Sequence, residues 1–162
     1  TFPLPNYGRR NYFCVPNTSG LDRAAAIAAA RAARRILGRT PFGKTVAAVA
    51  SGRRTLSGWK QKPGYAQATD IVMARARAMG YTFEEHKYDR GIPGRYNASH
   101  AETQMLEVAP GEPFATSRAL CPSCKDYLGA YAQFTQTPVT VADPSGVRIF
   151  YPNGTVETIP EP

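Results

Sequence analysis

The sequence predicts an α/β domain whose central mixed sheet is flanked by helices. Helix-like and strand-like segments alternate along the 162 residues, and 43% of the residues are hydrophobic, enough for a real core. The last two clear strand segments, 138–142 and 147–151, are separated by only four residues. A parallel crossover needs a dozen or more residues, so this pair must close the domain as an antiparallel hairpin.

The first half of the chain predicts a helix, a pair of strands and a second helix. Residues 1–19 contain three prolines and predict an irregular lead-in, so we expect one domain over 20–162. An alanine-rich helix is expected over 21–37, with its alanines packed on the sheet and its arginines facing outward. Strands at 44–51 and 54–60 follow, then a helix over 66–79 with Ile71 and Val72 among its core positions.

The second half predicts two helices that start close to residues with metal-binding chemistry. In chain order we expect an extended segment at 81–87, a loop at 91–97, a helix from near Ser99 to Val108, a strand at 114–120, a helix over 121–134, the closing hairpin, and a last strand at 155–159. No stretch approaches the ~18 apolar residues of a membrane span, so we expect no membrane partner.

Charge is divided unevenly between the two halves. Residues 1–80 carry 14 basic and two acidic side chains, a net charge of +12, whereas residues 81–162 carry a net charge of −4. Arginines outnumber lysines by fifteen to five. An arginine-rich basic half suggests a polyanionic partner, because the guanidinium group pairs with phosphate and stacks on bases. An ordinary solvated surface is the alternative interpretation.

The chemistry of the sequence is concentrated in His100-Ala101-Glu102 and Cys121-Pro122-Ser123-Cys124. Two cysteines three residues apart at a helix start can bind one metal ion, and His100 can supply a third ligand. Three protein ligands leave one tetrahedral position open, which is typical of catalytic zinc. Glu102 lies about 200° around an ideal helix from His100, so the two can cooperate only if the metal lies beyond the helix N-terminus.

Each of these motifs has a simpler interpretation when it is taken alone. Ser99 and Glu102 have the spacing of a capping box, and a lone histidine is commonly a packing residue. A Cys-x-x-Cys pair is also typical of redox dithiols. Only 41 residues follow Cys121, too few for the rest of a thioredoxin-type fold, so the combination favours zinc.

The two motifs together resemble the zinc-dependent cytidine-deaminase superfamily. Within it, the segment 88–102 (YDRGIPGRYNASHAE) is most similar to the bacterial toxin deaminases, which include members acting on cytosine in single-stranded DNA. The resemblance spans the elements from 21 to 151 and implies a three-layer cytidine-deaminase-like fold. One departure is that Leu120, not proline, precedes Cys121.

The resemblance also implies a role for each matching residue. His100, Cys121 and Cys124 would hold Zn²⁺, which makes hydroxide available near neutral pH. Glu102 would carry a proton from the water to the ring nitrogen and assist the departure of ammonia. Ala101 would have its backbone near the edge of the pyrimidine.

Three further residues are candidates for substrate binding. Asn97 and Tyr96 would contact the sugar and stack on the base, with capping and packing as the alternative. Trp59, the only tryptophan, lies among basic residues, as in single-strand binders, although a core position at a strand end is also common.

We therefore expect a zinc-dependent cytosine deaminase acting on single-stranded DNA, as the C-terminal toxin domain of a larger protein. The resemblance implies delivery by a bacterial secretion system, activity in the cytoplasm of the recipient cell, and a cognate immunity protein. We expect a monomer. The alternatives are deamination of RNA or of free nucleotides, and a zinc-stabilised nucleic-acid-binding module without turnover.

Overall fold

A computed structural model describes residues 20–161 of the chain. The elements in chain order are α2 (Gly20–Ala33), η2 (Arg34–Ile36), β1 (Val46–Val49), β2 (Arg54–Leu56), α3 (Thr69–Met79), α4 (Arg95–Ala98), α5 (Ala101–Val108), β3 (Phe114–Thr116), α6 (Pro122–Thr135), β4 (Val139–Asp143), β5 (Gly146–Phe150) and β6 (Val156–Pro160). The predicted lead-in over 1–19 lies outside the described residues. Across the described residues, none of the helices combines the length and the apolar character that crossing a bilayer requires.

The six strands form one mixed sheet in the order β2-β1-β3-β4-β5-β6. β3 and β4 are parallel because α6 carries the chain back between them, and all other neighbours are antiparallel. The closing hairpin of β4 and β5 turns at Pro144 and Ser145, between the paired residues Asp143 and Gly146. The predicted fold class and the antiparallel hairpin are therefore confirmed.

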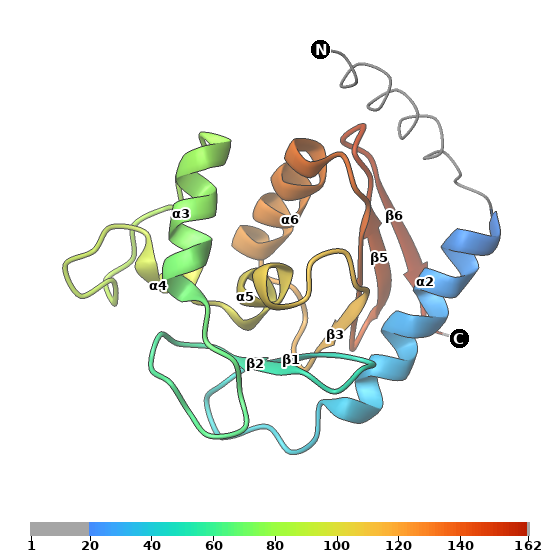
Figure 1. Ribbon diagram of the computed structural model, residues 1–162, viewed down its shortest axis with the longest axis horizontal. Coiled ribbons are helices and arrows are strands. Elements are labelled where there is room, and N and C mark those ends of the chain that lie inside the picture. Colours follow the sequence, from blue (N-terminus) through green and yellow to red (C-terminus); the bar gives the residue numbers. More distant parts are fainter. Residues whose placement is uncertain (1–19, 162) are drawn as a thin grey trace, which may run out of the picture.

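The helices lie in two layers on opposite faces of the sheet (Figure 1). On one face, α2 packs Ala30 and Ala33 against a small cluster from β3, β4 and β5. On the other face, α3, α5 and α6 cover the main core, in which Met105, Phe114 and Tyr127 are fully or almost fully buried. Small side chains on α2 allow a close approach to the sheet, whereas the second face needs large side chains to fill the wider space.

The orientation expected for α2 is only half right. Ala30 and Ala33 pack on the sheet, but Arg23 and Arg34 reach over the same face and form ion pairs with Glu157 and Glu161. Other alanines of the helix are exposed: Ala24, Ala25 and Ala28. The acidic residues at and beyond β6 explain the difference, because long guanidinium side chains reach a charge partner at the sheet edge while their stems cover apolar surface.

Two local predictions differ from the structure. Ile71 is exposed rather than in the core, since α3 buries only the side that bears Val72 and Ala76. Residues 95–97, expected in a loop, form together with Ala98 the single helical turn α4. The segment 81–87, expected to be extended, forms neither a helix nor a strand of the sheet, and its Phe83 is buried in the main core.

Candidate active site

The starts of two helices bring three metal-binding side chains together. His100 is the N-cap of α5, Cys121 is the N-cap of α6, and Cys124 lies in the first turn of α6. His100 Nδ1 is 3.1 Å from Cys124 Sγ and 3.6 Å from Cys121 Sγ, and the three ligand atoms all lie within 4.8 Å of one another. This group can hold a metal ion.

The separations of these atoms fit tetrahedral zinc. Zinc bonds of about 2.3 Å to sulfur and 2.0–2.1 Å to nitrogen place tetrahedral ligands roughly 3.6 Å apart. One nitrogen and two sulfur donors are a set that zinc favours, and they leave one tetrahedral position for water or substrate. The donors come from segments about 20 residues apart, so the fold of β3 and α6 creates the site.

The two cysteines differ in how readily they lose a proton. The pKa of the Cys121 thiol falls to about 4, because the Cys124 thiol donates a hydrogen bond to its sulfur and His100 and the Cys124 N–H do the same. The hydrogen bond with Cys121, together with burial, raises the pKa of Cys124 well above its ordinary value. Cys121 is thus a thiolate at neutral pH, which is the form that binds metals.

Glu102 lies beside the three ligands in the first turn of α5 and is almost completely buried. Burial raises the pKa of its carboxyl group, and Thr116 Oγ1 donates a hydrogen bond to Oε2 at 3.1 Å. The N-cap of the helix is His100, and no side chain caps it, so the capping-box interpretation of Ser99 and Glu102 is wrong. A buried carboxylate with a raised pKa is suited to accepting and returning a proton.

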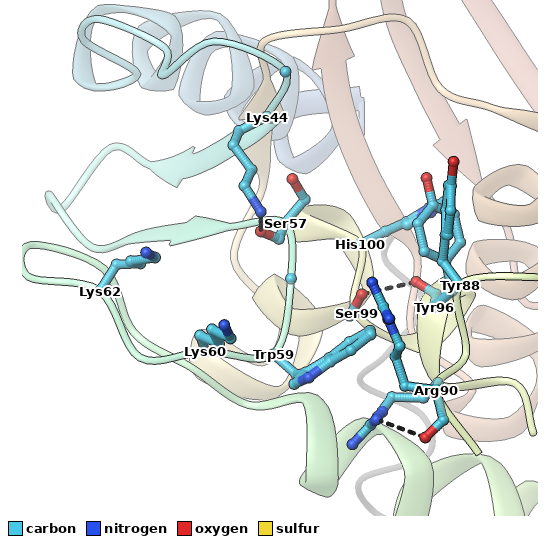
Figure 2. A pocket seen from close by; sticks show the side chains of 13 residues that line it. Lys44, Ser57, Trp59, Lys60, Lys62, Tyr88, Arg90, Tyr96, Ser99 and His100 are labelled. Carbon is cyan, nitrogen blue, oxygen red and sulfur yellow. Dashed lines mark hydrogen bonds between the residues drawn. The ribbon is translucent and has the colours of Figure 1, made fainter. Parts of the chain in front are cut away.

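A cavity of about 650 Å³ opens onto His100. Its walls are unusually rich in basic and aromatic side chains. The lining residues are Gly43, Lys44, Ser57, Gly58, Trp59, Lys60, Lys62, Tyr88, Arg90, Arg95, Tyr96, Ser99 and His100. In Figure 2, the aromatic side chains of Tyr88 and Tyr96 stand with His100 on one side, and the lysines stand on the other.

Tyr96 belongs to a stack of rings that forms one wall of this cavity. Its ring stacks on His86 with centroids 3.9 Å apart and meets His100 edge-on at 5.5 Å. The loop that carries these rings is held by Asp89, whose carboxylate accepts the backbone N–H groups of His86, Gly94 and Tyr96. The wall is therefore fixed next to the metal ligands by a single buried carboxylate.

Trp59 lies in the cavity wall rather than in a core. The guanidinium carbon of Arg95 is 4.0 Å from the centre of its ring, a cation–π contact. Arg95 in turn donates to the carbonyls of Asp89 and Arg90. The indole is thus held against the Asp89 loop, with Lys60 and Lys62 close behind it in the sequence.

The other two predicted substrate contacts differ in their surroundings. Ala101 is buried at the start of α5, where its carbonyl accepts a hydrogen bond of 2.8 Å from Thr55 Oγ1. Asn97 is not among the residues that line the cavity, and its side-chain amide donates to the carbonyl of Glu84. A sugar contact by Asn97 stays a prediction that the local hydrogen bonding does not favour.

Sequence reasoning missed several residues that build the site. Lys44 and Arg90 line the cavity from loops and Arg95 lines it from the start of α4, and their charge alone did not indicate these positions. Gln104 is fully buried in α5, accepts the Ala68 N–H, and donates to the carbonyls of Leu56, Gly58 and Ser99. The only available signal for Gln104 was a polar residue on the side of an amphipathic helix that faces the core.

The distribution of basic charge also differs from expectation. Four arginines of the +12 half pair with acidic side chains of the other half: Arg23 with Glu157, Arg34 with Glu161, Arg53 with Glu112, and Arg75 with Glu107. The cavity instead takes basic residues from both halves. A ligand in the cavity therefore meets the charge of the cavity lining and not the net charge of one half of the chain.

Comparison with known families agrees with this geometry. Residues 54–106 match the family model described as single-strand DNA deaminase toxin A, C-terminal. This segment runs from β2 to α5, contains Trp59, His100 and Glu102, and ends before Cys121. No curated protein matches the chain. The match confirms the resemblance noted in the sequence: over residues 54–106, the chain is similar to the bacterial single-strand DNA deaminase toxins.

Proposed function

We propose that the chain is a zinc-dependent deaminase that converts cytosine to uracil in single-stranded DNA and acts as a bacterial toxin domain. The observation that carries this proposal is the meeting of His100, Cys121 and Cys124 beside the buried Glu102, at the end of a cavity lined with basic and aromatic residues. The family match over residues 54–106 supports the reaction class and the substrate.

The chemistry follows from the positions of the residues around this group. Zinc, when bound by His100, Cys121 and Cys124, supplies Lewis-acid activation of water and lowers its pKa from 15.7 to about 7. Glu102 accepts the proton of the attacking water, delivers it to the ring nitrogen next to the amino-bearing carbon, and then assists the loss of ammonia. Thr116 holds Glu102 in place through the hydrogen bond to Oε2.

The lining of the cavity suits a nucleotide that is part of a nucleic-acid strand. Tyr96, whose ring lies edge-on to His100, would stack on the target base, and the Ala101 backbone at the start of α5 would lie near the pyrimidine edge. Lys44, Lys60 and Lys62 place positive charge where a phosphodiester backbone would run. A free nucleotide needs far less of this surface, so the lining favours single-stranded nucleic acid over a small-molecule substrate.

The toxin assignment determines where the domain would act. We propose that residues 20–162 form the C-terminal toxin domain of a larger protein, delivered by a bacterial secretion system into the cytoplasm of a recipient cell. The site needs a thiolate at Cys121, which a reducing cytoplasm preserves. A cognate immunity protein with an acidic surface would suit the basic cavity.

The decisive experiment compares matched substrates and one variant. Oligonucleotides with a single cytosine are incubated as single-stranded DNA, duplex DNA and RNA, and uracil is quantified. We expect uracil in single-stranded DNA, and a loss of at least about 100-fold in Glu102→Gln, because positioned proton transfer contributes about 10²–10⁴-fold. Zinc content and melting temperature of the variant should match the wild type.

Each alternative predicts a different pattern in the same experiment. Uracil formed only in RNA, or only from free cytidine nucleotides, refutes the DNA assignment. Zinc-dependent binding of oligonucleotides with no uracil in any substrate, and no difference between wild type and Glu102→Gln, shows a binding module without turnover.

A further inference from the structure

Phe42 is the most exposed large apolar side chain of the described residues 20–161. It is fully exposed, whereas the next such side chain, Ile71, has 55% of its surface exposed. Single exposed apolar residues are common on protein surfaces and need no explanation by themselves. Phe42 is informative because the two residues that follow it, Gly43 and Lys44, line the cavity.

The backbone turn that contains Phe42 holds its side chain in solvent, away from the rest of the fold. The Lys44 N–H donates to the Pro41 carbonyl at 3.1 Å and closes a turn in which Gly43 has φ +75°, a value that favours glycine. The end of this turn is fastened to the edge of the sheet: the Thr45 N–H donates to Ser57 Oγ at 3.0 Å. Phe42 therefore stands at the corner of a pinned turn and has no nearby core to enter.

This turn is continuous with the active-site cavity. Gly43 and Lys44, which directly follow Phe42, both line the cavity. Lys44 Nζ donates to the Ser57 carbonyl at 3.3 Å, and Figure 2 shows Lys44 reaching from its loop toward the strand end that leads to Trp59. A side-chain carbon placed on Gly43 would meet nothing within 4 Å, so the backbone between Phe42 and Lys44 borders open space.

We propose that Phe42 is a stacking platform for the base of a nucleotide that neighbours the target cytosine and lies outside the cavity. The inference rests on the proposed function, in which the substrate is single-stranded DNA. An exposed ring beside Lys44, with Lys60 and Lys62 in the adjoining cavity wall, combines an aromatic face with a basic track. Single-strand binders use this combination, because every base has a face that can stack.

Equilibrium binding tests this proposal without turnover. The Glu102→Gln protein and its Phe42→Ala double variant are titrated with a fluorescent single-stranded oligonucleotide that carries one cytosine. We expect Phe42→Ala to weaken binding about 5- to 150-fold, the range for one base stacked on an aromatic ring. Phe42→Trp should retain affinity, whereas Phe42→Leu, which is apolar but has no ring, should lose it.

Two further measurements separate stacking from charge and from misfolding. The slope of log affinity against log salt should be unchanged in Phe42→Ala but smaller in Lys60→Gln, because only the lysine displaces counterions. Phe134→Ala is the matched control, since Phe134 is half-exposed near the far end of α6 and does not line the cavity. It should bind like the parent protein.

Oligonucleotides with one abasic site identify the stacked neighbour. An abasic site at one position beside the cytosine should weaken binding of the parent protein but cause no further loss in Phe42→Ala. The proposal is overturned if Phe42→Ala binds within twofold of the parent, or if no abasic position depends on Phe42. If wild type deaminates no substrate and the Glu102→Gln protein binds no oligonucleotide, the proposed function itself fails.

Discussion

Gln104 joins the helix that carries Glu102 to the segment that carries Trp59, so its replacement should damage both stability and substrate binding. Its side-chain oxygen accepts the Ala68 N–H at 2.8 Å, and its amide nitrogen donates to the Leu56 carbonyl at 3.1 Å. Methionine has a similar unbranched length but neither donates nor accepts strongly, so Gln104→Met removes these bonds with little change in volume.

The expected loss of stability follows from the groups left without a partner. The carbonyls of Gly58 and Ser99 keep other donors, from Gln67 and from the Gly58 N–H. We therefore count only two buried backbone groups, on Leu56 and Ala68, at about 1–3 kcal/mol each. The free energy of unfolding should fall by about 2–6 kcal/mol, which for a chain of this size lowers the melting temperature by roughly 5–20 °C.

Urea denaturation of the zinc-loaded protein measures this change, with the melting temperature as a second readout. Gln133→Leu is the matched control, because Gln133 is exposed on α6 and its replacement should change stability by no more than about 0.5 kcal/mol. At a temperature where both proteins are folded, Gln104→Met should also raise KM for single-stranded DNA. A loss of stability below about 1 kcal/mol, with KM unchanged, would refute the role assigned to Gln104.

Two other predictions concern the metal and the turn beside it. Removing zinc with a chelator, or replacing Cys124 by serine, should lower the melting temperature and abolish deamination. Added zinc should restore both properties in the chelated wild type but not in Cys124→Ser, and metal analysis can verify the zinc content of each protein. Asp143 is buried, and although burial alone raises its pKa, hydrogen bonds from Ser145 and Leu120 and the charge of Arg148 hold the pKa below its ordinary value. Because the pKa of Asp143 is lower in the folded than in the unfolded protein, its carboxylate stabilises the fold fully at pH values above the unfolded pKa of about 3.9. This stabilisation is lost as the pH falls through the folded pKa. Asp143→Asn should therefore lower the melting temperature at pH 7 and reduce its dependence on pH below about 4; an unchanged acid profile would contradict this assignment.

Local sequence patterns predicted most of the helices and strands. They failed where contacts with segments distant in the sequence determine which side of a helix is buried. The helix over 121–134 and the closing hairpin follow from periodicity, turn residues and a short connection, all of which are properties of adjacent residues. Ile71 and the arginines of α2 fit the same patterns but depend on which surface the helix meets. That surface is made by strands distant in sequence, so periodicity alone could not identify it.

The residue types and their spacing predicted which three side chains would form the metal-binding group. His100, Cys121 and Cys124 are specific residue types at the starts of two helices, and a helix start fixes the direction of the side chains that flank it. The lining of the cavity, in contrast, depends on how distant loops fold together. Its walls combine loops near residues 44, 59 and 90, which are held by hydrogen bonds of Ser57, Gln104 and Asp89, respectively. For that reason the sequence could predict the chemistry, and the fold alone showed that the basic residues beside it come from both halves of the chain.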